Sequence, residues 1–526
     1  MDPWELSLFD QLLDLDFLEV SLLIFDGRAP SVDSNPRTGL RKLWPGNFLW
    51  KWQKSLEKKL FKAIDPDPSR VKGLFEKTPK ISMNPLRKGF VDYFEEKECE
   101  QLFAYDLDLI LRHEFNIIKG AILQVPKYGI WSLHHGDNDV NRGGPAGFWE
   151  IVESHEVVGV TLQKLTPELD GGKIIEKAFY NINWSFTKNQ QFVQFSSIQL
   201  VLKNLRKVFH GKFSVEDSLT YSLPLYRSPG LKPTLKYLWK FYREFTYTLF
   251  YRMFHSKGEN LWKVYVGKGD FIHAPLFRAK EIPQPEGEFW ADPFVFEKDG
   301  VKYLFFERFF YDKKKACISV GILEKGKVRD VTDIIDDGIH RSYPNVFEDG
   351  GEIYMIPESC ANKKLEVYKA KNFPYQWELY STAFEGEELA DVNFLRDQDG
   401  IAWIFFSKGF WFDLNSDLYI YQIDSLKMND LKPHLQNPVI IDSRSARNGG
   451  KIYQRNGEYF RPSQRNVKGK YGFGVNINKI IELNLDNYRE EKIVSATPSF
   501  FPKLTGFHHV DNHGDYYVID AATRKK

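Results

Sequence analysis

The chain has 526 residues, a length typical of two or three domains, and its 42% hydrophobic and 27% charged residues are those of a globular protein. With 72 Lys and Arg against 71 Asp and Glu, the net charge of +1 gives no basis for binding nucleic acid. Cys99, Cys317 and Cys360 are too few and too scattered for a disulfide framework or a zinc site, so we expect no metal.

The N-terminus predicts no export signal. Residues 1–5 are acidic and lack a basic stretch, and the longest apolar run near the start, residues 17–25, contains Glu19 and is too short to cross a bilayer. We therefore expect a cytoplasmic protein without a transmembrane segment.

Residues 1–212 are expected to form an α/β domain of the Rossmann-like type. Short apolar runs alternate with helical stretches, a pattern that predicts a mostly parallel sheet with its ligand beyond the carboxyl ends of the strands. The predicted strands are 20–25, 80–83, 106–111, 129–133, 157–162 and 173–179, and the predicted helices are 4–18, 48–64 and 190–212.

Residues 213–259 are expected to form a helical connector. The stretch 231–256 is helical, aromatic and basic, which allows two interpretations: a helix on a membrane surface, or a connector packed between domains. Apolar residues occur on nearly every face of this helix rather than in one stripe, so we favour the connector.

Residues 260–526 predict an all-β domain with five repeats. Asp-Gly and Asn-Gly pairs between aromatic strands are hairpin signals. Five similar strings recur about 50 to 60 residues apart, anchored at Asp292, Tyr343, Asp391, Asn448 and His509, which indicates a five-bladed β-propeller. We expect the strand-like residues 262–266 to close the ring with the last blade.

Two stretches of the first half predict a site for chemistry. Ser132 and His134 lie at the end of one predicted strand, and Asp170 follows another, in the string Leu-Asp-Gly-Gly. A histidine and a carboxylate at neighbouring strand ends can polarise an acyl carbonyl and accept a proton from an incoming amine. The pattern predicts acyl transfer to nitrogen, with Ser132, His134 and Asp170 as catalytic residues.

These strings resemble the formyltransferase family, which transfers a formyl group from 10-formyltetrahydrofolate to an amine. Residues 134, 142–143, 145, 159–161 and 169–172 match the family pattern in order, and the resemblance covers residues 15–210. It implies that His134 binds the developing oxyanion and that Asp170 orients it and takes the proton. Ser132 stands where the family has asparagine, and the chain opens in a helix, without the family's first strand. We expect the donor or substrate to contact His135, Asp137, Arg142, Gly143 and Gly144.

The second half resembles the propellers of family-43-type glycoside hydrolases and, more closely, the propeller of plant glucosamine inositolphosphorylceramide transferases. The strings that carry this resemblance include Ala-Asp-Pro-Phe at 291–294, Ser-Tyr-Pro at 342–344 and Arg-Pro-Ser-Gln at 461–464. It implies a central funnel lined by the first strand of each blade. The residues predicted to line this funnel and bind carbohydrate are Asp292, Glu307, Glu358, Asp391, Arg461 and Gln464.

The leading hypothesis is a formyltransferase that acts on a nucleotide- or lipid-linked amino sugar, with a carbohydrate-binding propeller. A methionyl-tRNA formylase is disfavoured, because the second half offers no basic stretch for tRNA. One alternative is a glycosidase or glycosyltransferase centred on the propeller, which needs a carboxylate pair about 5–10 Å apart. A glycan-binding scaffold without catalysis is the other.

Overall fold

The computed structural model describes residues 1–28, 45–62, 66–140, 142–168, 172–216, 225–254, 260–409 and 413–524. The chain divides into two compact units, each described below by itself. Unit 1 comprises Met1–Ala178 and Ile182–Tyr247, and unit 2 comprises Phe179–Asn181 and Thr248–Lys526. The predicted boundaries at 212/213 and 259/260 stay predictions.

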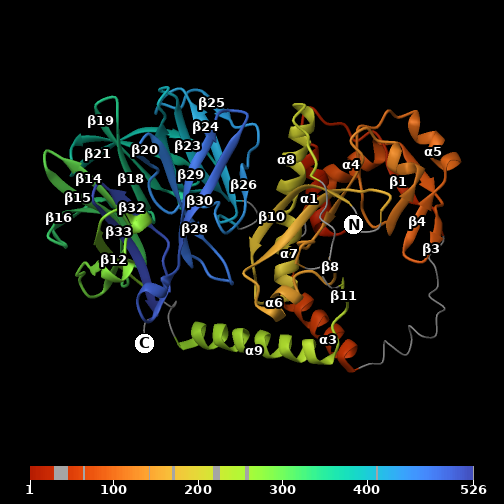
Figure 1. Cartoon of the computed structure of the whole chain (residues 1–526), viewed down its shortest axis with the longest axis horizontal. Helices are drawn as coiled ribbons and strands as arrows, with labels where there is room; N and C mark the ends of the chain where they lie inside the picture. The colour runs from red at the N-terminus through yellow and green to blue at the C-terminus, as the bar shows by residue number, and fades with distance from the viewer. Residues whose placement is uncertain are drawn as a thin grey trace. The chain divides into compact units, whose positions relative to one another are not determined.

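Unit 1 is a mixed α/β structure built on small sheets (Figure 1). Its central sheet has the order β10-β9-β7-β5, in which β5 runs parallel to β7 and β9 runs antiparallel to it. The other sheets are β1-β2, β3-β4-β6 and β11-β8. The strands are β1 (Leu23–Asp26), β2 (Lys80–Met83), β3 (Leu86–Lys88), β4 (Val91–Phe94), β5 (Ile110–Leu111), β6 (Ile117–Gly120), β7 (Ile130–His134), β8 (Arg142–Gly143), β9 (Val157–Lys164), β10 (Lys173–Asn181) and β11 (Leu225–Tyr226).

The helices of unit 1 cover these sheets and include one, α9, whose last residues belong to unit 2. They are α1 (Pro3–Leu12), α3 (Pro45–Leu60), α4 (Ser69–Lys77), α5 (Glu96–Phe103), α6 (Trp149–Glu153), α7 (Phe186–Ser196), α8 (Ile198–Phe209) and α9 (Leu231–Phe254). In the part of the chain that the structure describes, no helix is both long enough and apolar enough to span a membrane.

The sequence predicted the fold class of unit 1 but not every element in it. The sheet is mixed rather than mostly parallel, because β9 returns antiparallel beside β7. The strand expected at 106–111 is reduced to β5, because Asp106 adopts a positive φ of 46° that an extended strand cannot contain. The helix expected at 190–212 is two helices that meet at Ser197, and the first helix ends at Leu12 rather than residue 18.

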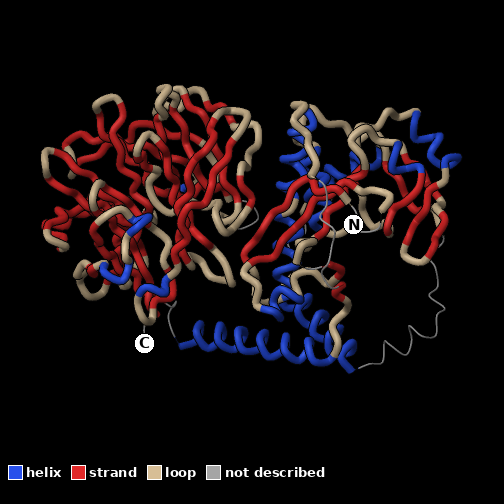
Figure 2. Tube along the Cα trace, viewed as in Figure 1, coloured by secondary structure: helices blue, strands red, loops and turns tan. Residues whose placement is uncertain are grey.

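Unit 2 is a five-bladed β-propeller, as the sequence predicted, and is built almost wholly of strands (Figure 2). Four blades are antiparallel sheets of consecutive strands. They are β14 (Glu288–Lys298) to β17 (Lys327–Ile335), with β15 (Val301–Phe310) and β16 (Lys315–Glu324); β18 (Ser342–Asp349) to β21 (Gln376–Ala383), with β19 (Glu352–Glu358) and β20 (Leu365–Asn372); β22 (Leu389–Arg396) to β25 (Leu431–Pro433), with β23 (Ala402–Lys408), β24 (Asp417–Ile423) and the short β26 (Ile440–Ile441); and β27 (Tyr453–Arg455) to β30 (Tyr488–Ala496), with β28 (Glu458–Arg465) and β29 (Gly474–Leu483).

The fifth blade joins the two ends of unit 2. β12 (Asn260–Lys268) pairs antiparallel with β33 (Tyr516–Arg524) over nine residue pairs, from Asn260↔Arg524 to Lys268↔Tyr516. The sheet is completed by β13 (Lys280–Glu281), β31 (Leu504–Gly506) and β32 (Val510–His513). The predicted closure of the ring by residues 262–266 is confirmed, because the first strand of unit 2 and its last strand lie in the same blade.

The first strands of three blades carry the same backbone feature at the repeat anchors. Asp292, Tyr343 and Asp391 have positive φ values of 47°, 49° and 52°. At each of them the pairing with the next strand shifts register, so a β-bulge turns the anchor side chain out of the regular alternation. In the fourth blade Gly450, with φ 141°, stands near this place. The repeat seen in the sequence is therefore a repeated bulge.

Candidate functional site

The predicted catalytic histidine lies at the carboxyl end of a central strand. His134 is the last residue of β7 and pairs with Thr161 of β9, within the Gly-Val-Thr string. Ser132 is buried two residues earlier on the same strand and pairs with Gln163. Asp170 lies outside the described residues. Gly172, which follows it, is so close to Gln163 that a methyl group added there would lie 3.1 Å from the amide oxygen.

An arginine that the sequence reasoning missed reaches this strand end. Arg112, just after β5, donates a hydrogen bond of 2.9 Å from Nη1 to Oγ of Ser132, and its other nitrogens bond the carbonyl oxygen of Phe115. Ser132 thus accepts from a cation and keeps its own proton to donate. A fixed positive charge beside a strand-end histidine suits stabilisation of a developing oxyanion. Its position just after a predicted strand was the only signal for it in the sequence.

A cavity of about 240 Å³ opens beside the carboxyl ends of β5 and β7. Ser132 and His135 line it, whereas His134 is not among its lining residues. Helix α1 forms one wall: the ring of Trp4 meets the ring of His135 edge-on at 5.2 Å, and Glu5 lies 3.3 Å from Nδ1 of His113.

His135 lies in a setting that keeps it neutral. Burial, with the nearby His134 and His113, lowers its pKa to about 4. Its Nε2 lies 3.4 Å from Oγ of Ser197, at the junction of α7 and α8. A neutral imidazole at the cavity wall offers one donor and one acceptor to a ligand or to Ser197.

The other predicted ligand contacts lie on the loop after β7. The carboxylate of Asp137 is ion-paired with Lys177 of β10 at 2.7 Å, and Lys177 also reaches Asp139. The backbone at Arg142 and Gly143 forms β8, which pairs with β11. Gly143 has φ 87° and passes so close to the carbonyl of Tyr226 that a Cβ would lie 2.2 Å away, so this position requires glycine. Gly144 also bonds that carbonyl, at 3.3 Å.

The four acidic residues predicted for the propeller funnel come together in the structure. They form what we call the acidic cluster: Asp292, Glu307, Glu358 and Asp391. Glu307 pairs across from Ala291, and the amide of Asp391 donates to Glu358 at 3.3 Å. Gln464 joins them by donating to Asp391 at 2.8 Å. The cluster is contributed by the first two strands of successive blades.

Arg447, which the sequence reasoning had not selected, supplies the positive charge of the cluster. Its guanidinium contacts Asp391 at 2.6 Å and Glu358 at 3.2 Å, and it is itself buried. Its charge centre lies 5.2 Å from the ring of Tyr471, which is 45% exposed. A signal for Arg447 was present, because it directly precedes the repeat anchor Asn448.

Burial sets the protonation of the acidic cluster. Desolvation, reinforced by Asp520 and Asp391, raises the pKa of Asp292 to about 7. Burial and the neighbouring carboxylates also raise the pKa of Glu307 and of Glu358 well above the ordinary value. His340, 47% exposed, lies 3.5 Å from Glu307. Side chains that hold a proton near neutral pH can act as general acids.

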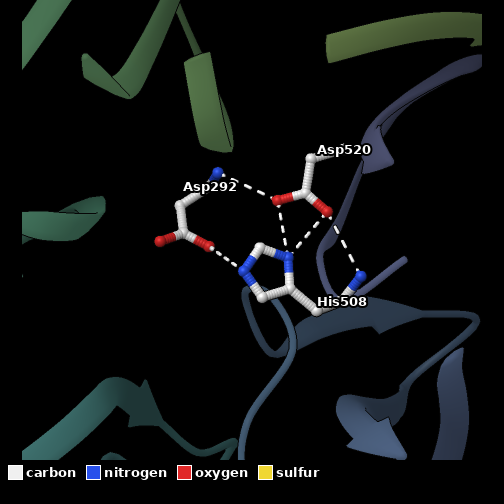
Figure 3. Close-up of side chains that lie close together, drawn as sticks. All are labelled: Asp292, His508 and Asp520. Carbon is white, nitrogen blue, oxygen red and sulfur yellow. Dashed lines mark hydrogen bonds and ion pairs between the residues drawn. The ribbon is translucent and has the colours of Figure 1, made fainter. Parts of the chain in front are cut away.

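A histidine between two carboxylates stands beside the cluster (Figure 3). His508 contacts Asp520 through Nδ1 at 2.7 Å and faces Asp292 through Nε2 at 3.7 Å. Burial opposes its protonation, but Asp520 and Asp292 raise the pKa of His508 above its ordinary value. The ligand atoms of these three residues lie within 4.8 Å of one another, so they have the donor set for a cation. In the structure, hydrogen bonds between His508 and Asp520 occupy that donor set.

Arg461, also predicted for the funnel, does not bond a carboxylate of the acidic cluster directly but donates to Oδ1 of Asn448 at 3.1 Å, and Asn448 donates to the carbonyl oxygen of Asp391. Its guanidinium donates to Glu490 of β30 at 2.8 and 2.6 Å and to the carbonyl oxygens of Ser445 and Ala446. The side chain is completely buried. These contacts link β28 to β30, two strands away in the same blade, and to the segment before β27, so the position of Arg461 is that of a blade-stabilising residue.

Comparison with known proteins gives a match in each half of the chain. Residues 277–499 match the family described as "Glucosamine inositolphosphorylceramide transferase 1, N-terminal". The protein of that name from Arabidopsis thaliana is 34% identical over 211 residues, which are 39% of this chain and 27% of the relative, and that from Oryza sativa subsp. japonica is 33% identical over 208 residues, 38% and 27%. The chain thus spans about a quarter of the length of these curated relatives.

The other match is to methionyl-tRNA formyltransferases. That of Bacillus thuringiensis subsp. konkukian is 28% identical over 173 residues, 32% of this chain and 53% of the relative. The chain therefore combines an N-terminal formyltransferase-like region with a propeller similar to the N-terminal part of glucosamine inositolphosphorylceramide transferases, and both resemblances seen in the sequence are confirmed. Both groups of relatives are transferases by name.

Comparison with solved structures finds glycoside hydrolases among the similar chains. The catalytic domain of the Coprinopsis cinerea GH62 alpha-L-arabinofuranosidase has a TM-score of 0.35 at 11% identity and covers 50% of this chain and 97% of that one. The GH43_1 enzyme from Xanthomonas citri complexed with xylose has a TM-score of 0.33 at 13% identity, covering 48% and 92%. The five-bladed architecture rests on the strand pairing described above.

Proposed function

We propose that the chain transfers a formyl group from 10-formyltetrahydrofolate to the amine of a nucleotide- or lipid-linked amino sugar, and that the propeller binds the carbohydrate. The observation that carries the proposal is the position of His134. It ends β7 directly beside the Gly-Val-Thr string of β9, in a region similar to methionyl-tRNA formyltransferases. The three free cysteines suit a cytoplasmic location, which is part of the proposal.

The cavity beside β7 suits one end of the donor. Sites for drug-sized ligands measure about 300–1,000 Å³, so a volume of about 240 Å³ is enough for the pterin ring system but not for a whole folate. Trp131, Leu133 and Leu162 offer apolar walls, while Arg112 and Glu114 offer a donor and an acceptor. A pterin is a flat heterocycle with polar edges, so it needs apolar walls for its faces and hydrogen-bonding groups for its edges.

The chemistry assigned to the residues is an acyl transfer. The neutral amine attacks the formyl carbon, a carbon–nitrogen bond forms, and the bond from that carbon to N10 of the folate breaks. His134 donates to the oxygen on which negative charge develops, and Arg112 holds the neighbouring Ser132 hydroxyl toward the same strand end. Asp170 takes the proton lost by the amine, and N10 receives one, which leaves a formamide and tetrahydrofolate.

The acidic cluster favours an amino sugar as the molecule that the propeller binds. Several buried carboxyl groups face a single guanidinium, that of Arg447. An ammonium group can replace the protons that Asp292 and Glu307 hold, whereas a carboxylated sugar would add like charge. The partly exposed ring of Tyr471 offers a flat face for a sugar ring.

The test is a formylation assay with 10-formyltetrahydrofolate and a panel of nucleotide-linked amino sugars, read by mass spectrometry. His134→Ala is expected to lower kcat/KM by about 10²–10³-fold, the cost of one oxyanion donor. His155→Ala is the matched control, because His155 pairs with Glu153 and is partly exposed after α6. A folded chain that formylates no amine, or a His134→Ala variant as fast as the wild type, contradicts the proposal.

The protonation of the acidic cluster favours a second candidate, a propeller-centred glycosidase or glycosyltransferase. An Asp292 pKa of about 7 beside an ion-paired Asp391 gives two carboxyl groups in different environments, as acid–base catalysis requires. Asp292→Asn then abolishes sugar turnover while folate binding persists. Under the formyl-transfer proposal, the same variant weakens sugar binding but leaves formylation of a saturating acceptor intact.

A further inference from the structure

Helix α9 and its neighbour α3 are fixed to unit 1 through their inner faces. Tyr237 of α9 donates to Glu57 of α3 at 2.6 Å, and Glu57 also accepts from Ser185 and from the amide of Thr187, at the start of α7. The ring of Trp50 packs edge-on against Tyr237. This buried network holds both helices in place, so their outer faces point away from the core of unit 1 (Figure 1).

The outer face of α9 carries large apolar side chains. Leu231, Leu235, Trp239 and Tyr247 are 45%, 51%, 62% and 46% exposed. The residues of the helix that are buried, Thr234, Tyr237 and Phe241, lie on the other side. The apolar residues of α9 thus lie on two faces, one covered and one exposed. The exposed face resembles the aromatic side of an interfacial helix.

Positive charge lies among these apolar residues. Lys232, Lys236 and Arg243 are exposed on the outer face, and Arg243 lies over the ring of Trp239 at 4.8 Å. The acidic Glu244 is bonded to Arg243. On α3 the exposed residues include Phe48, Trp52, Lys58 and Lys59. Over residues 45–60 and 231–247 there are eight Lys or Arg against two Glu, while the whole chain has a net charge of only +1.

We infer that this outer face of α3 and α9 is a docking surface for an anionic lipid bilayer. Its charge is complementary to anionic headgroups, and Trp and Tyr are the side chains that settle at the headgroup level. The methylene stems of the lysines lie along the helix while their ammonium groups reach the headgroups. The inference does not depend on formyl transfer, and it would bring the chain to the surface where lipid-linked sugars reside.

The test is co-sedimentation of the full chain with vesicles of phosphatidylcholine alone or with 30% phosphatidylserine. We expect binding to the anionic vesicles at 50 mM NaCl that weakens at 300 mM NaCl, since exposed charges are screened. Each Lys near an anionic leaflet contributes roughly fivefold to partitioning, so Lys232→Glu with Lys236→Glu lowers it by at least about 25-fold. Leu235→Ser with Trp239→Ser abolishes the binding that persists at high salt.

The matched control reverses two exposed lysines of the propeller, Lys371→Glu with Lys432→Glu, and is expected to bind as the wild type does. Circular dichroism checks that each variant is folded; because the replaced side chains are exposed, stability should not change. Failure to bind anionic vesicles at 50 mM NaCl overturns the inference. The inference is also overturned if the control variant loses as much vesicle binding as Lys232→Glu with Lys236→Glu, or if the chain binds RNA but no vesicles.

Discussion

The propeller of the wild type is expected to lose stability as the pH rises, and the variant Asp292→Asn is expected to lack the part of this loss that Asp292 causes. The carboxyl group is 6% exposed at the repeat anchor of β14, where it accepts from the amide of Tyr343 and faces His508. Burial raises its pKa to about 7 from an ordinary value of 3.8. Asn keeps an acceptor for Tyr343 but carries no charge at any pH.

The sign follows from where the proton is held. Between about pH 4 and pH 7 the folded chain keeps a proton on Asp292 that the unfolded chain releases, so the contribution of this group to stability is complete below about pH 4 and is lost as pH rises toward 7. A shift of about 3 units corresponds to at most about 4 kcal/mol at 1.36 kcal/mol per unit. His508 acts in the same direction, because its raised pKa gives stability that is complete below its unfolded value and is lost as pH rises.

The assay follows each unit through its own thiol. Cys317 is buried in β16 of the propeller and Cys99 in α5 of unit 1, so thiol labelling after equilibration in urea reports their unfolding separately. Between pH 4.5 and 7.5 the wild-type midpoint for Cys317 should fall by more than that of Asp292→Asn, and the variant should be the more stable at pH 7.5. The midpoint for Cys99 is the internal control. Equal pH dependence of Cys317 labelling in both proteins would refute the reasoning.

Two further predictions concern the blades, both measured as urea midpoints of Cys317 labelling. Arg461→Met leaves the carboxylate of Glu490, 10% exposed, without its cationic partner and should cost about 3–5 kcal/mol, whereas the exposed Arg329→Met should cost less than about 1 kcal/mol; similar costs would contradict the blade-stabilising role. Gly450→Ala would place a Cβ 1.8 Å from the carbonyl of Val510 at φ 141° and should destabilise far more than Gly400→Ala, where nothing lies within 4 Å; equal effects would mean that the strand shifts without cost.

The propeller was predictable because its signals are local. Asp299-Gly300 and Asn456-Gly457 both adopt positive φ at both positions, which is what a two-residue hairpin turn requires. Regular spacing of such turns gives the number of blades without knowledge of any long-range contact. The closure by β12 followed from one extra strand-like run at the start of the repeats.

Face alternation explains why Arg461 and Gln464, which the sequence predicted for one funnel, have different partners. Both lie on β28, but they are three residues apart, and side chains of a strand alternate between faces with a period of two. Gln464 therefore reaches Asp391, while Arg461 reaches Glu490. The spacing of the two residues was visible in the sequence, but both belong to one motif, Arg-Pro-Ser-Gln, and were therefore assigned together.

The α/β site was less predictable because its contacts are distant in sequence. Glu5 meets His113 across 108 residues, and Arg112 meets Ser132 across 20, between elements whose adjacency no periodicity reveals. His134 was found because it stands in a motif at a strand end. Arg112 and the α1 wall depend on how the sheet folds, so they could be seen only in three dimensions.

The two candidate sites place different chemical requirements on a substrate, and together these requirements limit the class of substrate that suits the chain. Beside His134, a nucleophilic nitrogen must arrive without its proton, since an ammonium has no lone pair with which to attack. The acidic cluster, with Arg447 already bonded to Asp391 and Glu358, offers acceptors and proton donors rather than further positive charge. A sugar that carries an amine meets both demands, whereas a sugar that carries a carboxylate meets neither. The proposed substrate class is therefore compatible with the chemistry of each unit considered alone.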